Sequence, residues 1–354
     1  MIKYFQQYNK NMAKIKIKPE KVTKKFLSVL PERSYDVIVR RYGLGEKPAR
    51  VTLESIGKDY GITRERVRQI ENNAIKNIKK SNVFNAETAI FEELKCLIDD
   101  LGGIATEEDI LNHIGKDDHI KNHIHFLLVL GDQFNKEKED RKFKSRWYVD
   151  SDVADIVHDV LEKLTDEISD DNLYPEEEII SLFVDKAGNL HAKYKNNPEM
   201  VKRWLAISKI VDKNHFNEWG LANSSNINAK GIRDYAYLSI RQHGSPMHFR
   251  EVAKSIENNF DRKAHVATCH NELIKDPRFV LVGRGLYALS EWGYASGIVR
   301  DVIINLLKKE GPLTKEDIID KVLRERYIKE NTVVVNLQNP KYFKRDNKGK
   351  YSIV

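Results

Sequence analysis

Two short amphipathic helices separated by a glycine are the strongest constraint that this sequence places on its fold. Leu53, Ile56 and Tyr60 recur at helical spacing and give the first helix one apolar face. Gly61 follows, and because glycine reaches positive φ without a steric penalty the chain can turn sharply there. A second apolar stripe runs along the next helix through Val67, Ile70, Ala74 and Ile78. Two such stripes pack together at the steep angle of a helix-turn-helix.

The opposite face of the second helix carries side chains that suit the edges of DNA bases. Thr63 is a good N-cap residue, so we expect the helix to begin directly after it. Arginine donates two hydrogen bonds to guanine, glutamine pairs with adenine, and glutamate accepts from cytosine. The residues of these types on this face are Arg64, Glu65, Arg68, Gln69 and Asn72. Taken alone, the same pattern also fits an ordinary solvated helix face.

Charge is distributed unevenly along the 354 residues, whose overall net charge is +7. Residues 1–80 hold 20 Lys and Arg against 8 Asp and Glu, whereas residues 81–228 hold 17 against 30. Basic clusters attract polyanions through counterion release, and acidic stretches repel DNA. The sequence therefore predicts a DNA-binding N-terminal segment and an acidic middle that meets protein or solvent.

Residues 21–80 resemble region four of primary-type bacterial sigma factors. The motifs that carry the resemblance are LPERSYDVIVRRYGLG and TLESIGKDYGITRERVRQIE. In that family the module reads the −35 promoter element and docks on the flap of the RNA polymerase β subunit. The resemblance implies base contacts by Arg64, Glu65, Arg68 and Gln69. It also implies phosphate contacts by Arg41, Thr63, Arg66 and Lys76.

The helix before the helix-turn-helix has a second expected role in this resemblance. Its apolar residues are Leu27, Leu30, Val37, Ile38 and Tyr42. We expect this helix to supply the core of the module and a surface that faces RNA polymerase. We find no counterpart of the sigma region that binds the polymerase clamp and melts the −10 element, so we do not expect a self-sufficient sigma factor.

The rest of the chain repeats one layout about every 70 residues. The helix openings read GGIATEEDIL from Gly102, YPEEEIISL from Tyr174, GSPMHFREVA from Gly244 and GPLTKEDII from Gly311, at offsets of 72, 70 and 67 residues. Each unit ends in an expected hairpin with an aromatic residue: KFKSRWYVD, FNEWGLA, FVLVGRGLYALS and GKYSIV. Helices followed by a terminal hairpin are the layout of a winged helix, so we predict four such units.

The third unit, residues 229–295, resembles the HARE-HTH domain, which also occurs in the δ subunit of bacterial RNA polymerase. The stretch RKAHVATCHNELIKDPRFVLVGRGLYAL carries the likeness. In that family the domain joins DNA- or polymerase-associated proteins and is not catalytic. The fourth unit has the same skeleton with a more basic wing, so we assign the third and fourth units to DNA contact and the acidic first and second to protein contact.

The expected fold class is therefore mainly α with small β-hairpin wings, a helix-turn-helix followed by tandem winged-helix domains. The expected segments are a basic tail (1–20), the region-four-like module (21–85), and winged-helix-like units at 86–150, 151–228, 229–295 and 296–354.

No catalytic or metal-binding pattern is found in the sequence. It contains no P-loop, GxGxxG, nucleophile elbow or nuclease-like carboxylate set, and its two cysteines match no metal spacing. His119 and His123 have the spacing of paired ligands, but without a third ligand we interpret them, with His113 and His125, as residues of a helix surface. We expect no enzyme activity, no cofactor and no metal.

No apolar run approaches the ~18 residues of a membrane span. We therefore expect a cytoplasmic, nucleoid-associated protein that binds double-stranded DNA and does not enter a membrane. No heptad seam indicates a dimer, so a monomer is expected.

Three functions remain open at this point. The first is a transcription factor that acts with RNA polymerase and reads a −35-like element. The second is a δ-like modulator of the polymerase that reads no specific sequence. The third is an adaptor that brings a separate enzyme to DNA.

Overall fold

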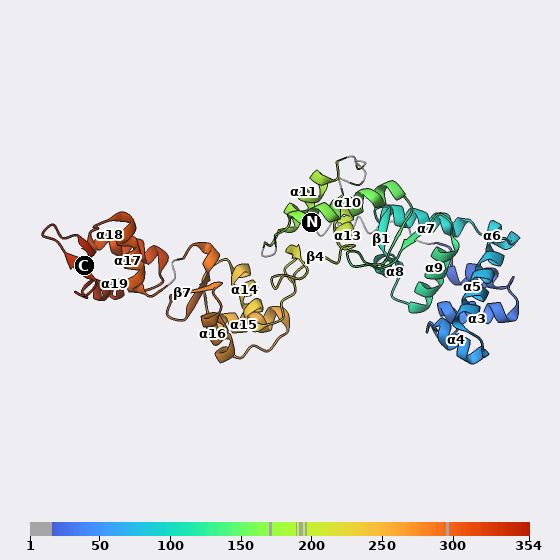
Figure 1. The fold of residues 1–354 in the computed structure, drawn as a ribbon, viewed down its shortest axis with the longest axis horizontal. Coiled ribbons are helices and arrows are strands. Elements are labelled where there is room, and N and C mark those ends of the chain that lie inside the picture. Colours follow the sequence, from blue (N-terminus) through green and yellow to red (C-terminus); the bar gives the residue numbers. More distant parts are fainter. Residues whose placement is uncertain (1–15, 170–171, 189, 191–193, 195–196, 295–296) are drawn as a thin grey trace. The chain divides into compact units, whose positions relative to one another are not determined.

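The computed structural model describes residues 16–169, 172–188, 190, 194, 197–294 and 297–354. The described residues fall into two compact units, one that ends at Asp212 and one that begins at Lys213 (Figure 1). Most of the expected basic tail, residues 1–15, lies outside the described residues. The chain is mainly helical with small antiparallel sheets, as the sequence predicted.

The first unit opens with the helix-turn-helix module. Its helices are α2 (Pro19–Leu27), α3 (Glu32–Tyr42), α4 (Leu53–Tyr60) and α5 (Arg64–Lys79), and Figure 1 shows α3, α4 and α5 grouped together. Thr52 and Thr63 cap α4 and α5, since each side chain accepts a hydrogen bond from a backbone N–H three residues ahead. Gly61 adopts the left-handed conformation with φ of 63°, which makes the predicted turn.

A second set of elements in this unit follows the module directly. It consists of α6 (Asn82–Ala86), α7 (Ala89–Asp100), β1 (Ile104–Thr106), α8 (Glu107–Ile114), α9 (Asp118–Leu130), β2 (Asn135–Glu137) and β3 (Arg146–Tyr148). The three strands form an antiparallel sheet in the order β1-β3-β2, with Ala105 and Lys136 both opposite Trp147.

The first unit ends with α10 (Ser151–Glu167), α11 (Glu176–Lys186), α13 (Pro198–Leu205) and the strand β4 (Val211–Lys213) at its boundary. Trp204 of α13 is fully buried, and its indole N–H donates to the Gly102 carbonyl at 3.1 Å. Its ring packs at 5.7 Å from the ring of Phe183 on α11. One large side chain thus joins α11 and α13 to the start of β1.

The second unit contains two sets of elements. The first is β5 (Trp219–Leu221), α14 (Ile232–His243), β6 (Met247–His248), α15 (Phe249–Phe260), α16 (Val266–Lys275), β7 (Phe279–Gly283), β8 (Leu286–Leu289) and the short 3-10 helix η1 (Ser290–Trp292). The second is α17 (Val299–Glu310), α18 (Lys315–Glu325), α19 (Glu330–Leu337), β9 (Phe343–Arg345) and β10 (Tyr351–Ile353).

Three of these sets share one strand arrangement. In each, a short extended segment between two consecutive helices pairs with the last strand of the terminal hairpin. The pairs are β1 with β3, β6 with β8, and Leu313 with Tyr351 of β10. The hairpins themselves are β2–β3, β7–β8 and β9–β10. Assignment of these sets as winged-helix domains, and the segment boundaries, stay predictions.

Much of the apolar surface of the helix-turn-helix module lies in a large core that it shares with the following elements, because α9 packs against α2 and α3. A single cluster of buried residues joins Phe26, Ile38 and Tyr42 of the module to residues of the following elements. The ring of Tyr42 lies 4.9 Å from that of Phe126 on α9. Burial of apolar side chains in this shared core is the main interaction that stabilises these short helices.

This packing confirms one prediction and leaves another open. Leu27, Val37, Ile38 and Tyr42 are buried and belong to the core, as expected. That the same helix also faces RNA polymerase stays a prediction, and any such contact would use its exposed side. Leu30 is half-buried. The sequence showed an apolar face and not the helix that covers it.

Polar contacts fix α9 against the module. The buried side chain of Asn122 donates to the carbonyls of Gly43 at 3.1 Å and Pro48 at 2.8 Å, and it accepts from Arg50 Nε at 2.8 Å. Thr23 Oγ1 and His123 Nδ1 lie 2.5 Å apart in the buried interface. These bonds satisfy backbone groups that the loop after α3 would otherwise bury unpaired.

The histidines of α9 are therefore structural. His123 and His125 are buried, so the expectation that they lie on a helix surface is wrong. Burial lowers the pKa of His123 to about 4, with smaller contributions from His119 and Lys24, so the neutral imidazole is the form packed here. Within the described part of the chain, no three His, Cys, Asp or Glu side chains come together as metal ligands would.

Among the residues that the structure describes, none of the helices has both the length and the apolar character that a membrane span requires.

The shared core predicts that Asn122→Ala destabilises the module and the following elements together. Loss of the amide leaves the buried Gly43 carbonyl, the Pro48 carbonyl and the Arg50 guanidinium without this partner, which costs about 1–3 kcal/mol of the free energy of unfolding. Urea unfolding of the full chain measures this change. Asn112→Ala, at an exposed position on α8, should change stability by less than about 0.5 kcal/mol. An equal effect of both substitutions would contradict the prediction.

Candidate nucleic-acid interface

The angle between α4 and α5 is set by a small apolar core and a close backbone approach. Val37, Ile56 and Val67 are buried in this core, one from each of α3, α4 and α5. A Cβ atom added at Gly57 would lie 2.7 Å from the carbonyl oxygen of Ile62. The backbone of the turn between α4 and α5 thus passes so close to Gly57 that no side chain fits there.

The apolar stripe of α5 divides between two cores. Val67 and Ile70 pack in the small helix-turn-helix core, as expected from the sequence. Ala74 and Ile78 belong instead to the large core shared with α9. Because the two ends of α5 are held by different neighbours, the helix is fixed along its whole length and its outer face is presented rigidly.

All four predicted base-reading residues lie exposed on α5. They are Arg64, Glu65, Arg68 and Gln69. Helical spacing places Glu65, Gln69 and Asn72 on the side opposite the buried residues. Arg64 is the first residue of the helix, and Arg68 lies one turn further along the same side.

Two of these residues form an ion pair with each other. Arg68 donates from Nε and Nη2 to the two carboxylate oxygens of Glu65 at 2.9 and 2.7 Å. The hydrogen bond raises the pKa of Arg68 and lowers that of Glu65. Arg66 Nη1 likewise donates to Gln69 Oε1 at 3.0 Å. A base that hydrogen-bonds to Arg68 or Gln69 must therefore replace the contacts that these side chains make with Glu65 and Arg66.

The predicted phosphate contacts differ in how available they are. Lys76 is exposed on the outer side of α5, and Thr63 is exposed at its N-cap with its oxygen accepting from the Arg66 N–H. Arg41 is less available, because its Nε lies 3.7 Å from the carboxylate of Glu71 and its Nη1 donates to the Val51 carbonyl at 3.4 Å. Arg41 thus links α3 to α5 and to the segment before α4.

Glu71 is a residue that the sequence reasoning missed. It lies on the inner side of α5 and is only 9% exposed, although charged residues in a basic helix are ordinarily solvated. Its place in the apolar register, four residues after Val67, was the available signal. Its partner Arg41 lies 30 positions earlier, and no local pattern connects the two.

A further group missed from the sequence is the pair that ties the end of α5 to the next elements. Lys79 Nζ lies 2.5 Å from Asp132 in the turn after α9. The charge of Lys79 is therefore paired, whereas Lys76 and Lys80 near the end of α5 remain exposed.

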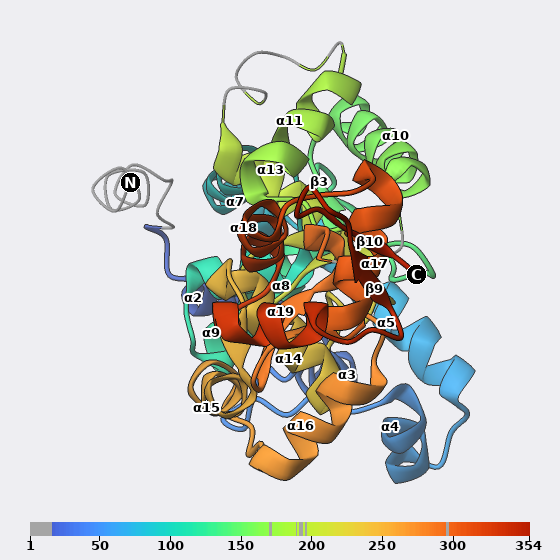
Figure 2. The ribbon, with the colours of Figure 1, turned by 90° about the vertical axis from the view of Figure 1, so that its left-hand side faces the viewer.

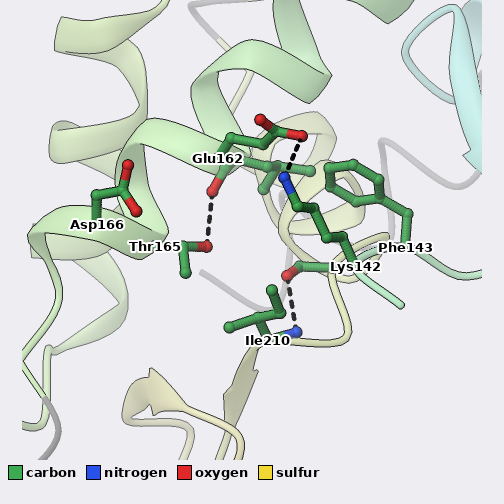
Figure 3. A pocket seen from close by; sticks show the side chains of 8 residues that line it. Lys142, Phe143, Glu162, Thr165, Asp166 and Ile210 are labelled. Carbon is green, nitrogen blue, oxygen red and sulfur yellow. Dashed lines mark hydrogen bonds and ion pairs between the residues drawn. The ribbon is translucent and has the colours of Figure 1, made fainter. Parts of the chain in front are cut away.

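A cavity of about 240 Å³ lies elsewhere in the first unit (Figure 3). Its labelled residues are Lys142, Phe143, Glu162, Thr165, Asp166 and Ile210. Lys142 Nζ lies 3.0 Å from Glu162, so its charge is already neutralised. The arrangement supports packing of α10 against the chain around the β2–β3 hairpin.

Comparison with known proteins identifies the module. Residues 26–80 match the family described as Sigma-70, region 4. Over 53 residues the chain is 51% identical to the RNA polymerase sigma factor RpoD of Helicobacter pylori, which covers 15% of this chain and 8% of that protein. It is 45% identical over 53 residues to the RNA polymerase sigma factor SigA of a Bacillus species, covering 15% of this chain and 14% of that protein.

A second kind of sigma factor also matches. The chain is 38% identical over 71 residues to the RNA polymerase sigma factor RpoS of Coxiella burnetii, covering 20% of this chain and 19% of that protein. The chain thus spans less than a fifth of the length of these relatives. The resemblance to sigma region four, a DNA-binding element of transcription proteins and not an enzyme family, is confirmed for residues 26–80.

The close approach at Gly57 predicts an unusual sign for Gly57→Ala. In an ordinary helix interior this change stabilises by about 1 kcal/mol. Here the new methyl group meets the Ile62 backbone, so we expect a loss of about 1–3 kcal/mol and weaker DNA binding. Thermal unfolding and DNA titration measure the two effects. Ser55→Ala, exposed on the same helix, is the control, and a stabilised Gly57→Ala protein would refute the proposed geometry.

Proposed function

We propose that this protein is a DNA-binding transcription factor that acts with RNA polymerase and reads a −35-like promoter element through α5. The observation that carries the proposal is the exposed outer face of α5 on a region-four helix-turn-helix. An α-helix fits the major groove of duplex DNA, where each base pair presents a distinct set of donors and acceptors. The mechanism is binding, not chemistry.

In this proposal Arg64, Glu65, Arg68 and Gln69 read base edges. The Glu65–Arg68 ion pair supports a specific role for both, because it holds the guanidinium in a defined orientation before DNA arrives. A guanine then competes with Glu65 for Arg68, and the amino group of a cytosine on the opposite strand can donate to the released carboxylate. A wrong base pair leaves one of the two charged groups without a partner.

Phosphate contacts set the register of the helix in the groove. Thr63, Arg66 and Lys76 are exposed around α5 and suit this role. Arg41 is part of the same proposal, but it reaches a phosphate only if its contacts with Glu71 and Val51 are exchanged. We therefore expect a larger contribution from Lys76 than from Arg41.

Arg68→Ala should weaken binding at the preferred site roughly 5- to 150-fold and relax the preference at one base pair. Selection from a random duplex library, followed by titration of the selected site, measures both effects. Lys95→Ala, which removes one exposed positive charge from α7, is the matched control and should leave the site preference unchanged. An unchanged preference in the Arg68→Ala protein would exclude α5 as the reading helix.

We infer that the contact with RNA polymerase lies in a groove formed by α3 and the end of α4. The groove, of about 800 Å³, is lined by Glu32, Arg33, Tyr35, Asp36 and Tyr60. Two contacts shape it: Tyr60 donates to Asp36 at 2.7 Å, and the Arg33 guanidinium lies over the Tyr60 ring at 5.0 Å. Tyr35 is 46% exposed at its edge, and aromatic residues of this kind are enriched at protein interfaces.

Co-elution of the full chain with core RNA polymerase tests this contact. Deletion of residues 1–80 is unsuitable, since it would expose the core shared with α9. We expect Tyr35→Ser to abolish co-elution while DNA binding is retained. Ile274→Ser changes an apolar residue of α16 that is 62% exposed and should leave co-elution intact.

The same pair of variants separates the other functions. Loss of co-elution in Ile274→Ser alone would favour the δ-like modulator, because the polymerase contact would then lie in the segment that resembles HARE-HTH. No co-elution of the unmodified protein would contradict a role with polymerase and favour the adaptor that brings a separate enzyme to DNA.

A further inference from the structure

The C-terminal hairpin carries a charge that the structure leaves unneutralised. Between residues 341 and 350 there are five basic residues and a single acidic one, Asp346. The basic residues, Lys341, Lys344, Arg345, Lys348 and Lys350, are all exposed. We call residues 341–353, which include β9 and β10, the basic hairpin.

Asp346 offsets only one of these five positive charges, and in the fully described hairpin no basic side chain forms an ion pair with it. Its carboxylate accepts the backbone N–H groups of Lys348 and Lys350 at 2.9 and 2.8 Å, which holds the turn of the hairpin. The Arg345 guanidinium lies 5.8 Å from the centre of the Tyr351 ring, so it stays beside the hairpin. Within the described residues, none of the four lysines has an ion-pair partner.

The other two hairpins of this arrangement carry fewer unpaired basic side chains. In the β2–β3 hairpin Arg146 is buried and paired with Glu137, and Lys136 lies 2.5 Å from Glu107. Lys138 and Arg141 of that hairpin are exposed, but three acidic residues lie among its basic ones. The β7–β8 hairpin carries a single basic residue, Arg284. The excess of exposed, unpaired basic side chains is therefore largest on the basic hairpin.

The helix next to the basic hairpin presents a face of matching chemistry. Five residues join the end of α19 to β9, and Figure 2 shows α19, β9 and β10 toward the viewer. The exposed residues on this side of α19 and just after it are Asn331, Thr332, Val335, Gln338 and Asn339. They are amides, a hydroxyl and one methyl-bearing side chain, which can contact base edges and the thymine methyl group without repelling phosphate.

We propose that α19 and the basic hairpin, residues 330–353, form a second duplex-DNA surface, in which the basic hairpin binds phosphates and the exposed face of α19 lies along a groove. Duplex DNA carries one negative charge per about 1.7 Å of axis, so a row of unpaired cations on one hairpin meets several phosphates at once. The choice of DNA as the polyanion rests on the proposed function. The existence of a polyanion-binding site at the basic hairpin does not rest on that function, because the basic hairpin lies in the second unit and uses none of the residues of α5.

The test is the salt dependence of binding to a duplex that contains no preferred site. The variant Lys344→Gln/Lys348→Gln/Lys350→Gln of the full chain should reduce the slope of log K against log salt by about 2–3, since each lost phosphate contact removes about 0.9. The matched control is Lys254→Gln/Lys308→Gln/Lys309→Gln, three exposed lysines of the same unit with the same change in charge. The control should keep the original slope.

Each other outcome overturns the proposal. An equal loss of slope in both variants would indicate a general effect of net charge, and no loss in either would exclude the basic hairpin from DNA contact. A reduced slope with duplex RNA alone would assign the surface to RNA, and loss of co-elution with core polymerase alone would assign it to protein. Failure of α5 to read a sequence leaves this result unchanged, because the probe has no site to read.

Discussion

Burial of the apolar face of α2 and α3 against α9 is the interaction on which the rest of the first unit depends. It unites the helix-turn-helix and the following elements in one core, and it fixes the C-terminal half of α5 through Ala74 and Ile78. Asn122 makes the arrangement specific, since its single amide satisfies two carbonyls of the loop after α3. An isolated region-four module of this sequence would expose the apolar surface that α9 covers.

This packing changes how the region-four resemblance translates into function. The outer face of α5 is exposed and carries all four of the residues proposed to read bases, so it remains accessible to DNA. The apolar face of α2 and α3 is not available for contact with another protein, because α9 of the same chain covers it. Contacts with a partner protein must therefore use other surfaces of the module, such as the groove beside Tyr35.

Electrostatics divides the basic residues of this chain into two groups. Some, such as Arg41, Arg146 and Lys79, are held by carboxylates and serve the fold. Others, on the outer side of α5 and on the basic hairpin, keep exposed charge. Ion pairs between exposed groups contribute little stability, so the free cations are explained more naturally by a polyanionic partner than by folding. Net charge counted along the sequence does not distinguish the two groups.

The sequence by itself determined the local features: the helix-turn-helix, its threonine caps, the turn at Gly61 and the outer face of α5, because each depends on residues within about one turn of helix from one another. It also predicted a mainly helical chain with small hairpins. Tertiary structure decided what covers the apolar face of α2 and α3, why His123 is buried, and that Glu71 is held by Arg41. These contacts join positions 30 to 100 residues apart, and no local periodicity records which distant surface a buried face will meet.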